Sequence, residues 1–250
     1  MKEALGRNLE GEMEGEMERT VVRAFDRIVI AVPELTGSTA QYHQLLGLDP
    51  YAPPGDPSQR AWFVLPNTVI ELVETSTEVA HILGIVFASD DAGVGDAMLE
   101  NTRDLDLRRC DGSRTEAVRS EREAVGAGDF RVDHLVLRTA DADECIDLFE
   151  KQLGLRLALD QTVPEWGGRM LFFRTGKLTL EIIEPSKNRD AVDNFWGIAY
   201  QCSDLGAVAR RLAGLGVTVS EVRKGRKPGS LVATVKSHCL GIPTLLLQPA

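Results

Sequence analysis

Two apolar stretches that lie far apart in the chain carry titratable side chains at corresponding places. In the later one, Asp133 and His134 open the run Leu-Val-Leu, and Glu181 interrupts the run Leu-Thr-Leu-Glu-Ile-Ile. In the earlier one, Arg27 stands in the place of His134, and Glu71 lies within the run Val-Ile-Glu-Leu-Val. A carboxylate that points from an apolar strand into a desolvated space is costly unless a metal, an arginine or a ligand neutralises it. These stretches are therefore the candidates for a functional site.

Arginine is one such neutralising group. Arg27 is the candidate partner of Glu71, because a planar, permanently charged guanidinium matches a carboxylate. Arg169, on a neighbouring predicted strand, is the corresponding candidate for Glu181. Trp166 precedes Arg169 in the loop Trp-Gly-Gly-Arg, whose aromatic ring and cation suit either the rim of a pocket or an exposed hairpin tip.

The elements that must position these residues recur along the chain. Residues 25–48 align without a gap with residues 132–155, and each segment has an acidic residue, an apolar run, an amphipathic stretch and a closing Leu-Gly-Leu. A shorter match places residues 84–91 over residues 197–204. Internal repeats of this kind decide the fold. The sequence therefore predicts four related modules, which begin near residues 23, 82, 131 and 195.

Each module is predicted to contain a strand, a helix and then further strands. Apolar β-branched runs predict the strands, and apolar residues at helical spacing predict helices that end at a glycine. In chain order, the predicted first strands and their helices are 24–32 and 36–46, 84–88 and 93–101, 132–139 and 142–152, and 197–202 and 205–215. The second module is the least regular, because residues 111–128 are polar and weakly periodic. In the fourth module, later strands are predicted near 217–223, 230–236 and 243–248.

The modules are predicted to form two halves. Residues 22–128 form the first half and residues 129–250 the second, while residues 1–21 form a charged tail that we expect to be disordered. The net charge of −10 argues against a nucleic-acid surface, and no apolar run is long enough for a membrane span. Four scattered cysteines indicate neither a disulfide framework nor a zinc site. We expect a cytoplasmic protein, a monomer or a homodimer, that binds neither nucleic acid nor membrane.

One basic cluster stands out in this acidic chain. Within the stretch Arg-Lys-Gly-Arg-Lys, it contains Arg223, Lys224, Arg226 and Lys227. Flanking apolar runs predict strands on both sides, so we expect the cluster to be a solvated hairpin tip.

A βαβββ unit that opens with Asp-His, closes its helix with Leu-Gly-Leu and ends in Leu-Glu-Ile-Ile-Glu-Pro resembles the modules of the vicinal oxygen chelate superfamily. This superfamily includes glyoxalase I, extradiol dioxygenases, methylmalonyl-CoA epimerase and bleomycin-resistance proteins. The resemblance covers residues 22–249 and is weakest in the second module. It implies an α+β fold in which four βαβββ modules form two paired half-barrel sheets with the helices outside. One such fold hosts many chemistries.

The resemblance also implies a metal site on the concave face of a paired sheet. Its usual ligands are a histidine from the start of a first strand and a glutamate from a last strand. His134 and Glu181 match these positions, whereas the first half keeps only Glu71 because an arginine replaces its histidine. One divalent ion (Fe, Mn, Ni or Zn) held by His134 and Glu181 would need water, His238 or Gln248 to complete its shell.

Two functions are open at this point. In the first, the metal site is incomplete or lost and the cavity binds a small organic molecule through residues that lie near it, namely Arg27, Trp166, Arg169, His238 and Gln248. In the second, the protein is a divalent-metal-dependent lyase, isomerase or dioxygenase that acts on a substrate with vicinal oxygens, and Glu71 or Glu181 transfers a proton. An interaction scaffold is a third option, and it would have cavities filled by side chains.

Overall fold

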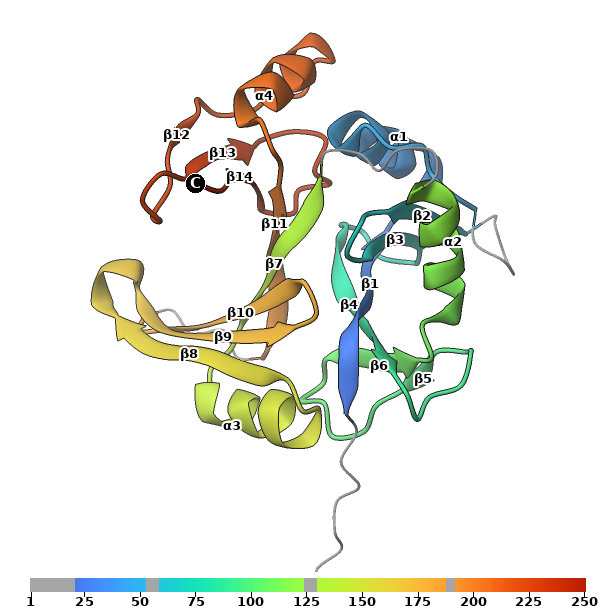
Figure 1. Ribbon diagram of the computed structural model, residues 1–250, viewed down its shortest axis with the longest axis vertical. Coiled ribbons are helices and arrows are strands. Elements are labelled where there is room, and N and C mark those ends of the chain that lie inside the picture. Colours follow the sequence, from blue (N-terminus) through green and yellow to red (C-terminus); the bar gives the residue numbers. More distant parts are fainter. Residues whose placement is uncertain (1–20, 53–58, 124–129, 188–191) are drawn as a thin grey trace, which may run out of the picture.

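The computed structural model describes residues 21–52, 59–123, 130–187 and 192–250. Its strands form two curved sheets that lie side by side, one built from the first half of the chain and one from the second (Figure 1). The predicted tail, apart from Val21, lies outside the described residues. No helix in the described ranges is long and apolar enough to cross a membrane.

The first sheet has six strands in the order β2-β3-β1-β4-β6-β5. The strands are β1 (Val22–Val32), β2 (Arg60–Val64), β3 (Val69–Glu74), β4 (His81–Ser89), β5 (Ala97–Met98) and β6 (Asp106–Cys110). β1 pairs in parallel with β3 and antiparallel with β4. The first two modules therefore join through their first strands.

The second sheet has eight strands in the order β12-β13-β14-β11-β7-β10-β9-β8. The strands are β7 (Arg131–Arg138), β8 (Arg156–Val163), β9 (Gly168–Thr175), β10 (Leu178–Pro185), β11 (Asn194–Gln201), β12 (Arg223–Lys224), β13 (Leu231–Val235) and β14 (Thr244–Gln248). β7 pairs in parallel with β10 and antiparallel with β11. This arrangement repeats that of the first sheet, so the third and fourth modules pair in the same way.

Helices connect the strands of each module. They are α1 (Leu35–Leu46), α3 (Ala142–Ile146), which continues as the π-helical segment η1 (Asp147–Gln152), and α4 (Leu205–Gly214); η2 (Pro164–Trp166) is a short turn of 3₁₀ helix. The Glu34 carboxylate accepts hydrogen bonds from backbone N–H groups in the first turn of α1, and Gly47 ends this helix at a φ of 68°. Asp204 caps α4 in the same way. Caps and a left-handed glycine satisfy backbone groups that a helix end leaves without partners.

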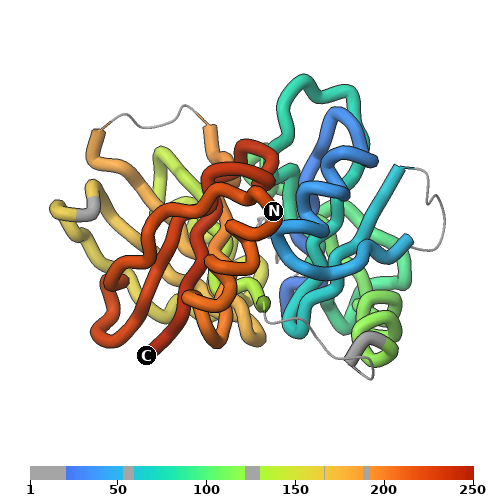
Figure 2. Tube along the Cα trace, turned by 90° about the horizontal axis from the view of Figure 1, so that it is seen from above, coloured from blue at the N-terminus to red at the C-terminus, as the bar shows by residue number. Residues whose placement is uncertain are grey.

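One apolar core joins the two sheets. It contains alternate side chains of both sheets and one face of each of α1, α3 and α4. Phe25, Tyr42, Phe149 and Tyr200 are among its fully buried members. Both views show the sheets back to back across this core (Figures 1 and 2). Each sheet curves away from the core, and we call the face that points away from it the concave face of that sheet.

The second module departs from the predicted plan. The helix predicted over 93–101 is absent, and the segment instead forms β5 and a series of turns in which Asn101, Arg103 and Asp104 have φ values of 55°, 57° and 61°. Gly93 and Gly95 disfavour a helix there, because glycine loses the most backbone freedom when a helix forms. In the fourth module, the strand predicted near 217–223 is reduced to β12 and one isolated bridge.

The polar segment that follows β6 contains a helix that the sequence did not predict, α2 (Ser113–Glu123). Its Val118 packs with Trp62, Val64 and Val69 on the concave face of the first sheet. Thr115 is also buried there, and its hydroxyl donates a hydrogen bond to Asp26. α2 therefore covers the concave face of the first sheet, whereas α1, α3 and α4 pack on the side of the core (Figure 1).

Candidate functional site

A β-bulge at the same place in β1 and β7 positions the candidate site residues. In the β1–β4 ladder, two residues of β1 oppose one of β4 between Phe25 and Arg27. In the β7–β11 ladder, the same shift lies between Val132 and His134. An extra residue in one strand breaks the alternation of faces. The aspartate and the residue after it can therefore both reach the concave face.

In the second sheet, this bulge brings Asp133, His134 and Glu181 together. The Nδ1 atom of His134 is 2.8 Å from Oδ2 of Asp133, and its Nε2 atom is 3.4 Å from Oε2 of Glu181. The imidazole thus lies between two carboxylates. The His134 and Glu181 side chains keep 20% and 11% of their surface exposed, so a ligand can reach both groups.

The pKa of Asp133 lies below its ordinary value. Burial alone would raise the pKa of this carboxyl, but the hydrogen bond and the charge of His134 lower it more, and the positive charges of Lys227 and Arg131 add to this effect. Asp133 is therefore ionised near neutral pH and orients the imidazole by accepting a hydrogen bond from the N–H group at Nδ1 of His134. That tautomer leaves Nε2 as the atom that faces Glu181 and the concave face.

Several side chains around this site are apolar, although Thr179 pairs with His134 and Arg138 pairs with Ile183 in the sheet. On β10, Leu180 and Ile182 belong to the shared core, so Glu181 and Ile183 lie on the concave face. By the same alternation, the concave face also carries Val136, Met170, Phe172, Leu245 and Leu247. Glu181 pairs in the sheet with Val136, and His134 pairs with Ala199. The imidazole of His134 and the carboxylate of Glu181 thus lie on a sheet face that also carries several apolar side chains.

The first sheet holds the corresponding residues in a closed ion cluster. Arg27 binds Glu71 through Nε at 3.0 Å and Asp26 through Nη1 at 2.7 Å, and its Nη2 binds Asp96. Arg60 binds the second oxygen of Glu71 at 2.8 Å. The ion pair predicted between Arg27 and Glu71 is present. Asp96 and Arg60 were not predicted from the sequence, because they come from a loop and a strand that no repeat relates to the cluster.

This cluster is buried under α2. The side chains of Arg27 and Glu71 are 5% and 1% exposed. Burial raises the pKa of Asp26 above its ordinary value, although Arg27 and Thr115 oppose the change. Burial would lower the pKa of Arg27, but its three carboxylate partners outweigh burial and raise it. With both Glu71 oxygens bound by guanidinium groups, the geometry gives this residue no access to a substrate proton, and Arg27 is likewise closed to a ligand.

The donors on the concave face of the second sheet do not fit a metal site of three or four protein ligands. Among the described residues, no group of three or more His, Cys, Asp and Glu side chains is placed to hold a metal ion. The Asp133 carboxylate is hydrogen-bonded to Nδ1 of His134. The possible metal donors are therefore one imidazole nitrogen, Nε2 of His134, and one carboxylate, that of Glu181. Arginine occupies the histidine position of the first sheet.

The other predicted site residues lie in different surroundings. Arg169 does not pair with Glu181 as predicted; it binds Asp160 and Asp143. His238 contacts the hydroxyl of Ser237 in the loop after β13. Trp166 ends η2, but its side chain lies outside what the structure describes. Among the described side chains, Arg169 and His238 therefore have hydrogen-bond partners other than His134 and Glu181.

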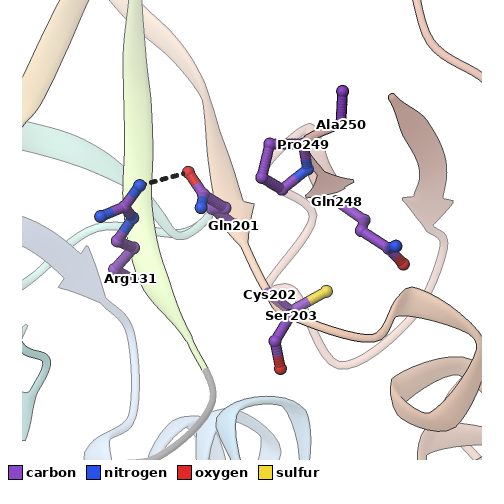
Figure 3. A pocket seen from close by; sticks show the side chains of 7 residues that line it. All are labelled: Arg131, Gln201, Cys202, Ser203, Gln248, Pro249 and Ala250. Atoms are coloured by element: carbon purple, nitrogen blue, oxygen red, sulfur yellow. Dashed lines mark hydrogen bonds between the residues drawn. The ribbon is translucent and has the colours of Figure 1, made fainter. Parts of the chain in front are cut away.

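Gln248 lines a pocket of about 540 Å³ at the start of β7 and the ends of β11 and β14 in the second sheet. The lining residues are Arg131, Gln201, Cys202, Ser203, Gln248, Pro249 and Ala250, and Arg131 donates a hydrogen bond to Gln201 across 2.8 Å (Figure 3). The side-chain oxygen of Gln248 accepts a hydrogen bond from the backbone N–H of Leu205 at 2.9 Å. Gln248 thereby helps to satisfy the N-terminus of α4.

Comparison with known proteins gives one family match. Residues 133–234 match the family described as the glyoxalase, bleomycin resistance protein and dioxygenase superfamily. No curated protein matches the chain.

Solved structures that resemble the chain cover about half of it. They include a hypothetical protein from Bacillus halodurans C-125 (17% identity, 48% of this chain and 95% of that chain, TM-score 0.43). Methylmalonyl-CoA epimerase from Mycobacterium tuberculosis is another (22% identity, 48% and 87%, TM-score 0.39). A variant of the Streptomyces coelicolor epimerase in complex with 2-nitronate-propionyl-CoA is a third (24% identity, 48% and 97%, TM-score 0.40).

The family match and the motifs of the sequence agree on the second half of the chain. The matched region begins at Asp133 in the bulge, ends at Thr234 in β13 and includes both His134 and Glu181. Its α+β architecture is the one that the repeats predict. Over residues 133–234, the chain is similar to the glyoxalase, bleomycin resistance protein and dioxygenase superfamily.

Proposed function

We propose that the protein binds a small organic molecule on the concave face of the second sheet, beside His134 and Glu181. The observation that carries this proposal is a partly exposed imidazole and carboxylate on a sheet face that also carries several apolar side chains. At 3.4 Å, Nε2 of His134 and Oε2 of Glu181 are farther apart than in a good hydrogen bond. Both atoms therefore keep hydrogen-bonding capacity for a ligand, while the apolar neighbours supply contact area.

The contrast between the two sheets supports one site per chain. In the first sheet, α2 covers the concave face and arginine neutralises the carboxylates. By contrast, α1, α3 and α4 pack on the core side of the sheets and not on the concave face of the second sheet (Figure 1). A ligand that needs an accessible apolar face with polar groups thus finds it on the second sheet. We expect a stoichiometry of one small molecule per chain.

A matched pair of variants tests the location of the site. Ile183 lies two residues after Glu181 on β10, and Val73 lies two residues after Glu71 on β3. Both are half-buried and lie on the concave face of their sheets. The probe is the neutral fluorescent compound N-phenyl-1-naphthylamine, titrated into the wild type, Ile183→Glu and Val73→Glu. Ile183→Glu should weaken probe binding by about ten-fold or more, because the bound probe would desolvate the new carboxylate. Val73→Glu, which places its charge on the first sheet, should leave probe binding unchanged.

The reverse pattern, with binding lost only in Val73→Glu, would place the ligand on the first sheet and refute the proposal. Binding that neither substitution alters would refute both locations. Circular dichroism spectra of the three proteins control for folding.

A metal-dependent enzyme is the second candidate, because His134 and Glu181 lie close together on one face. Two protein donors leave a divalent ion mostly to water and substrate. Elemental analysis of protein purified without chelator, beside a His134→Ala variant, separates the candidates. One divalent ion per chain that disappears in the variant would favour the enzyme, and a metal-free protein that still binds the neutral probe would favour the binding function.

A further inference from the structure

The basic cluster of the sequence borders the concave face of the second sheet. Arg223 and Lys224 form β12, the outermost strand, and the turn after it carries Arg226 and Lys227. The four side chains are exposed. Four cations within five residues create a local positive field in a chain whose net charge is −10. We call this segment, residues 223–230, the basic turn.

The basic turn lies against the pocket at the ends of β11 and β14. Leu231, which follows the turn, pairs with the pocket residue Gln248 in the β13–β14 ladder. Gly229 lies so close to the pocket residue Ala250 that a Cβ added to it would be 2.8 Å from the Ala250 side chain. Lys227 and Arg131 are both near enough to Asp133 for their positive charges to lower its pKa. The pocket therefore has Arg131 in its wall and further cations beside it.

Arg131 and Gln201 of the pocket lie on the same face as the pair of His134 and Glu181, whereas Gln248 and Cys202 line the pocket from the side of α4 and the core. In the β7–β11 ladder, Gln201 pairs with Arg131 and Ala199 pairs with His134. Two residues along a strand correspond to about 7 Å. Gln201 and Ala199 alternate with Tyr200, which points into the shared core, so both lie on the concave face. A molecule of ordinary metabolite size can reach from the apolar face to the pocket.

We propose that the ligand of this face is an organic anion, a molecule with an apolar body and a carboxylate, phosphate or sulfonate group. This inference rests on the proposed function. The apolar body would lie over Val136 and Leu245, and the acidic group would lie in the pocket beside Arg131 and the basic turn. A guanidinium group is suited to bind such an anion with two parallel hydrogen bonds. The carboxylates of Asp133 and Glu181 repel the acidic group, which orients the ligand toward the pocket.

Two fluorescent probes with the same aromatic skeleton test this inference. N-phenyl-1-naphthylamine is neutral, and 8-anilino-1-naphthalenesulfonate adds one sulfonate. Both are titrated into the full chain of the wild type, the double variant Lys224→Gln/Lys227→Gln and the single variant Arg131→Gln. The double variant Arg114→Gln/Lys151→Gln is the matched control, because it also removes two exposed cations, from α2 and η1.

The wild type should bind the sulfonate probe more tightly than the neutral one. Each of the two test variants should bind the sulfonate probe about five-fold more weakly than the wild type does. The affinity for the neutral probe should change by less than about two-fold, because only the charge interaction is removed. Raising the salt from about 0.02 M to about 0.5 M should weaken the sulfonate probe selectively. The control variant should behave as the wild type does.

The outcomes separate this inference from the function on which it rests. Equal affinity for the two probes, or sulfonate binding that is unchanged in both test variants, would overturn the anion specificity while the proposed binding function stands. A protein that binds neither probe would overturn the proposed function and this inference together. Competition by 1-naphthoate and 1-naphthyl phosphate then distinguishes a carboxylate site from a phosphate site.

Discussion

Replacing Arg27 with methionine tests whether the first sheet contains a structural ion cluster. The substitution keeps an unbranched side chain and removes the charge. Asp26 then loses its partner at 2.7 Å and keeps the Thr115 hydroxyl, while Glu71 keeps only Arg60. The side chains of Asp26 and Glu71 are 2% and 1% exposed, so water cannot replace the guanidinium. Removal of one partner from a buried pair costs about 3–5 kcal/mol, and we expect a loss of this size in the free energy of unfolding.

Urea unfolding at 25 °C, followed by circular dichroism, measures this loss. The matched control is Arg169→Met, because Arg169 in the second sheet binds Asp160 at 2.8 Å but the two side chains are 25% and 36% exposed. A partly solvated pair of this kind contributes up to about 1 kcal/mol. Equal losses in the two variants would refute the reasoning, since burial would then have no influence on the cost of the missing charge. Binding of the neutral probe by Arg27→Met should remain at one molecule per folded chain.

The loss of unfolding free energy in Arg27→Met should also depend on pH. Burial raises the pKa of Asp26, and the charge of Arg27 opposes this increase. Arg27→Met removes this charge, so Asp26 in the folded variant binds a proton at a higher pH than it does in the wild type. A group whose folded pKa is raised stabilises the folded state as the pH falls through that pKa. The difference in unfolding free energy between wild type and variant should therefore be smaller at about pH 5 than at about pH 8.

Two further predictions concern α2, which covers the first sheet, and the pair of Asp133 and His134 in the second sheet. In Val118→Asp, the new buried charge should detach α2 from the first sheet. Hydrogen exchange measured by mass spectrometry should then become faster in α2 and β2 but not in β7. An unchanged exchange pattern would show that the position of α2 does not depend on this contact. In Asp133→Asn, the loss of stability relative to wild type should be complete above the ordinary aspartate pKa of 3.8 and vanish as the pH falls below it, because the folded pKa of Asp133 is lowered. Urea titrations across the acidic range measure this difference, and a difference that persists at low pH would contradict an electrostatic role.

The repeats in the sequence were sufficient to predict the architecture. Four copies of a strand, a helix and further strands require the same pairing of elements, and apolar periodicity decides which face of each strand is buried. The residues Arg27, Glu71, His134 and Glu181 were found in this way, because each is a polar group at a position where its strand is otherwise apolar. The pairing of Arg27 with Glu71 followed from charge alone.

Other features depend on contacts between distant segments. α2 is a polar helix with one buried apolar contact at Val118, so its own sequence carries too little periodicity to predict it, and its position is set by the face that it covers. Arg169 was predicted beside Glu181 from strand order, but the register places it opposite Glu184 and its charge is taken by Asp160. Register and side-chain reach are properties of the folded sheet.

The sequence by itself indicated the α+β fold, the resemblance to the superfamily and the two polar positions on each sheet, because these depend on local patterns that repeat. Only the tertiary structure decided that α2 covers the concave face of the first sheet, whereas none of the described helices covers that of the second. It also decided that the basic turn lies beside the pocket with Arg131. The physical reason is that burial and electrostatic fields are sums over residues that are close in space and far apart in the chain.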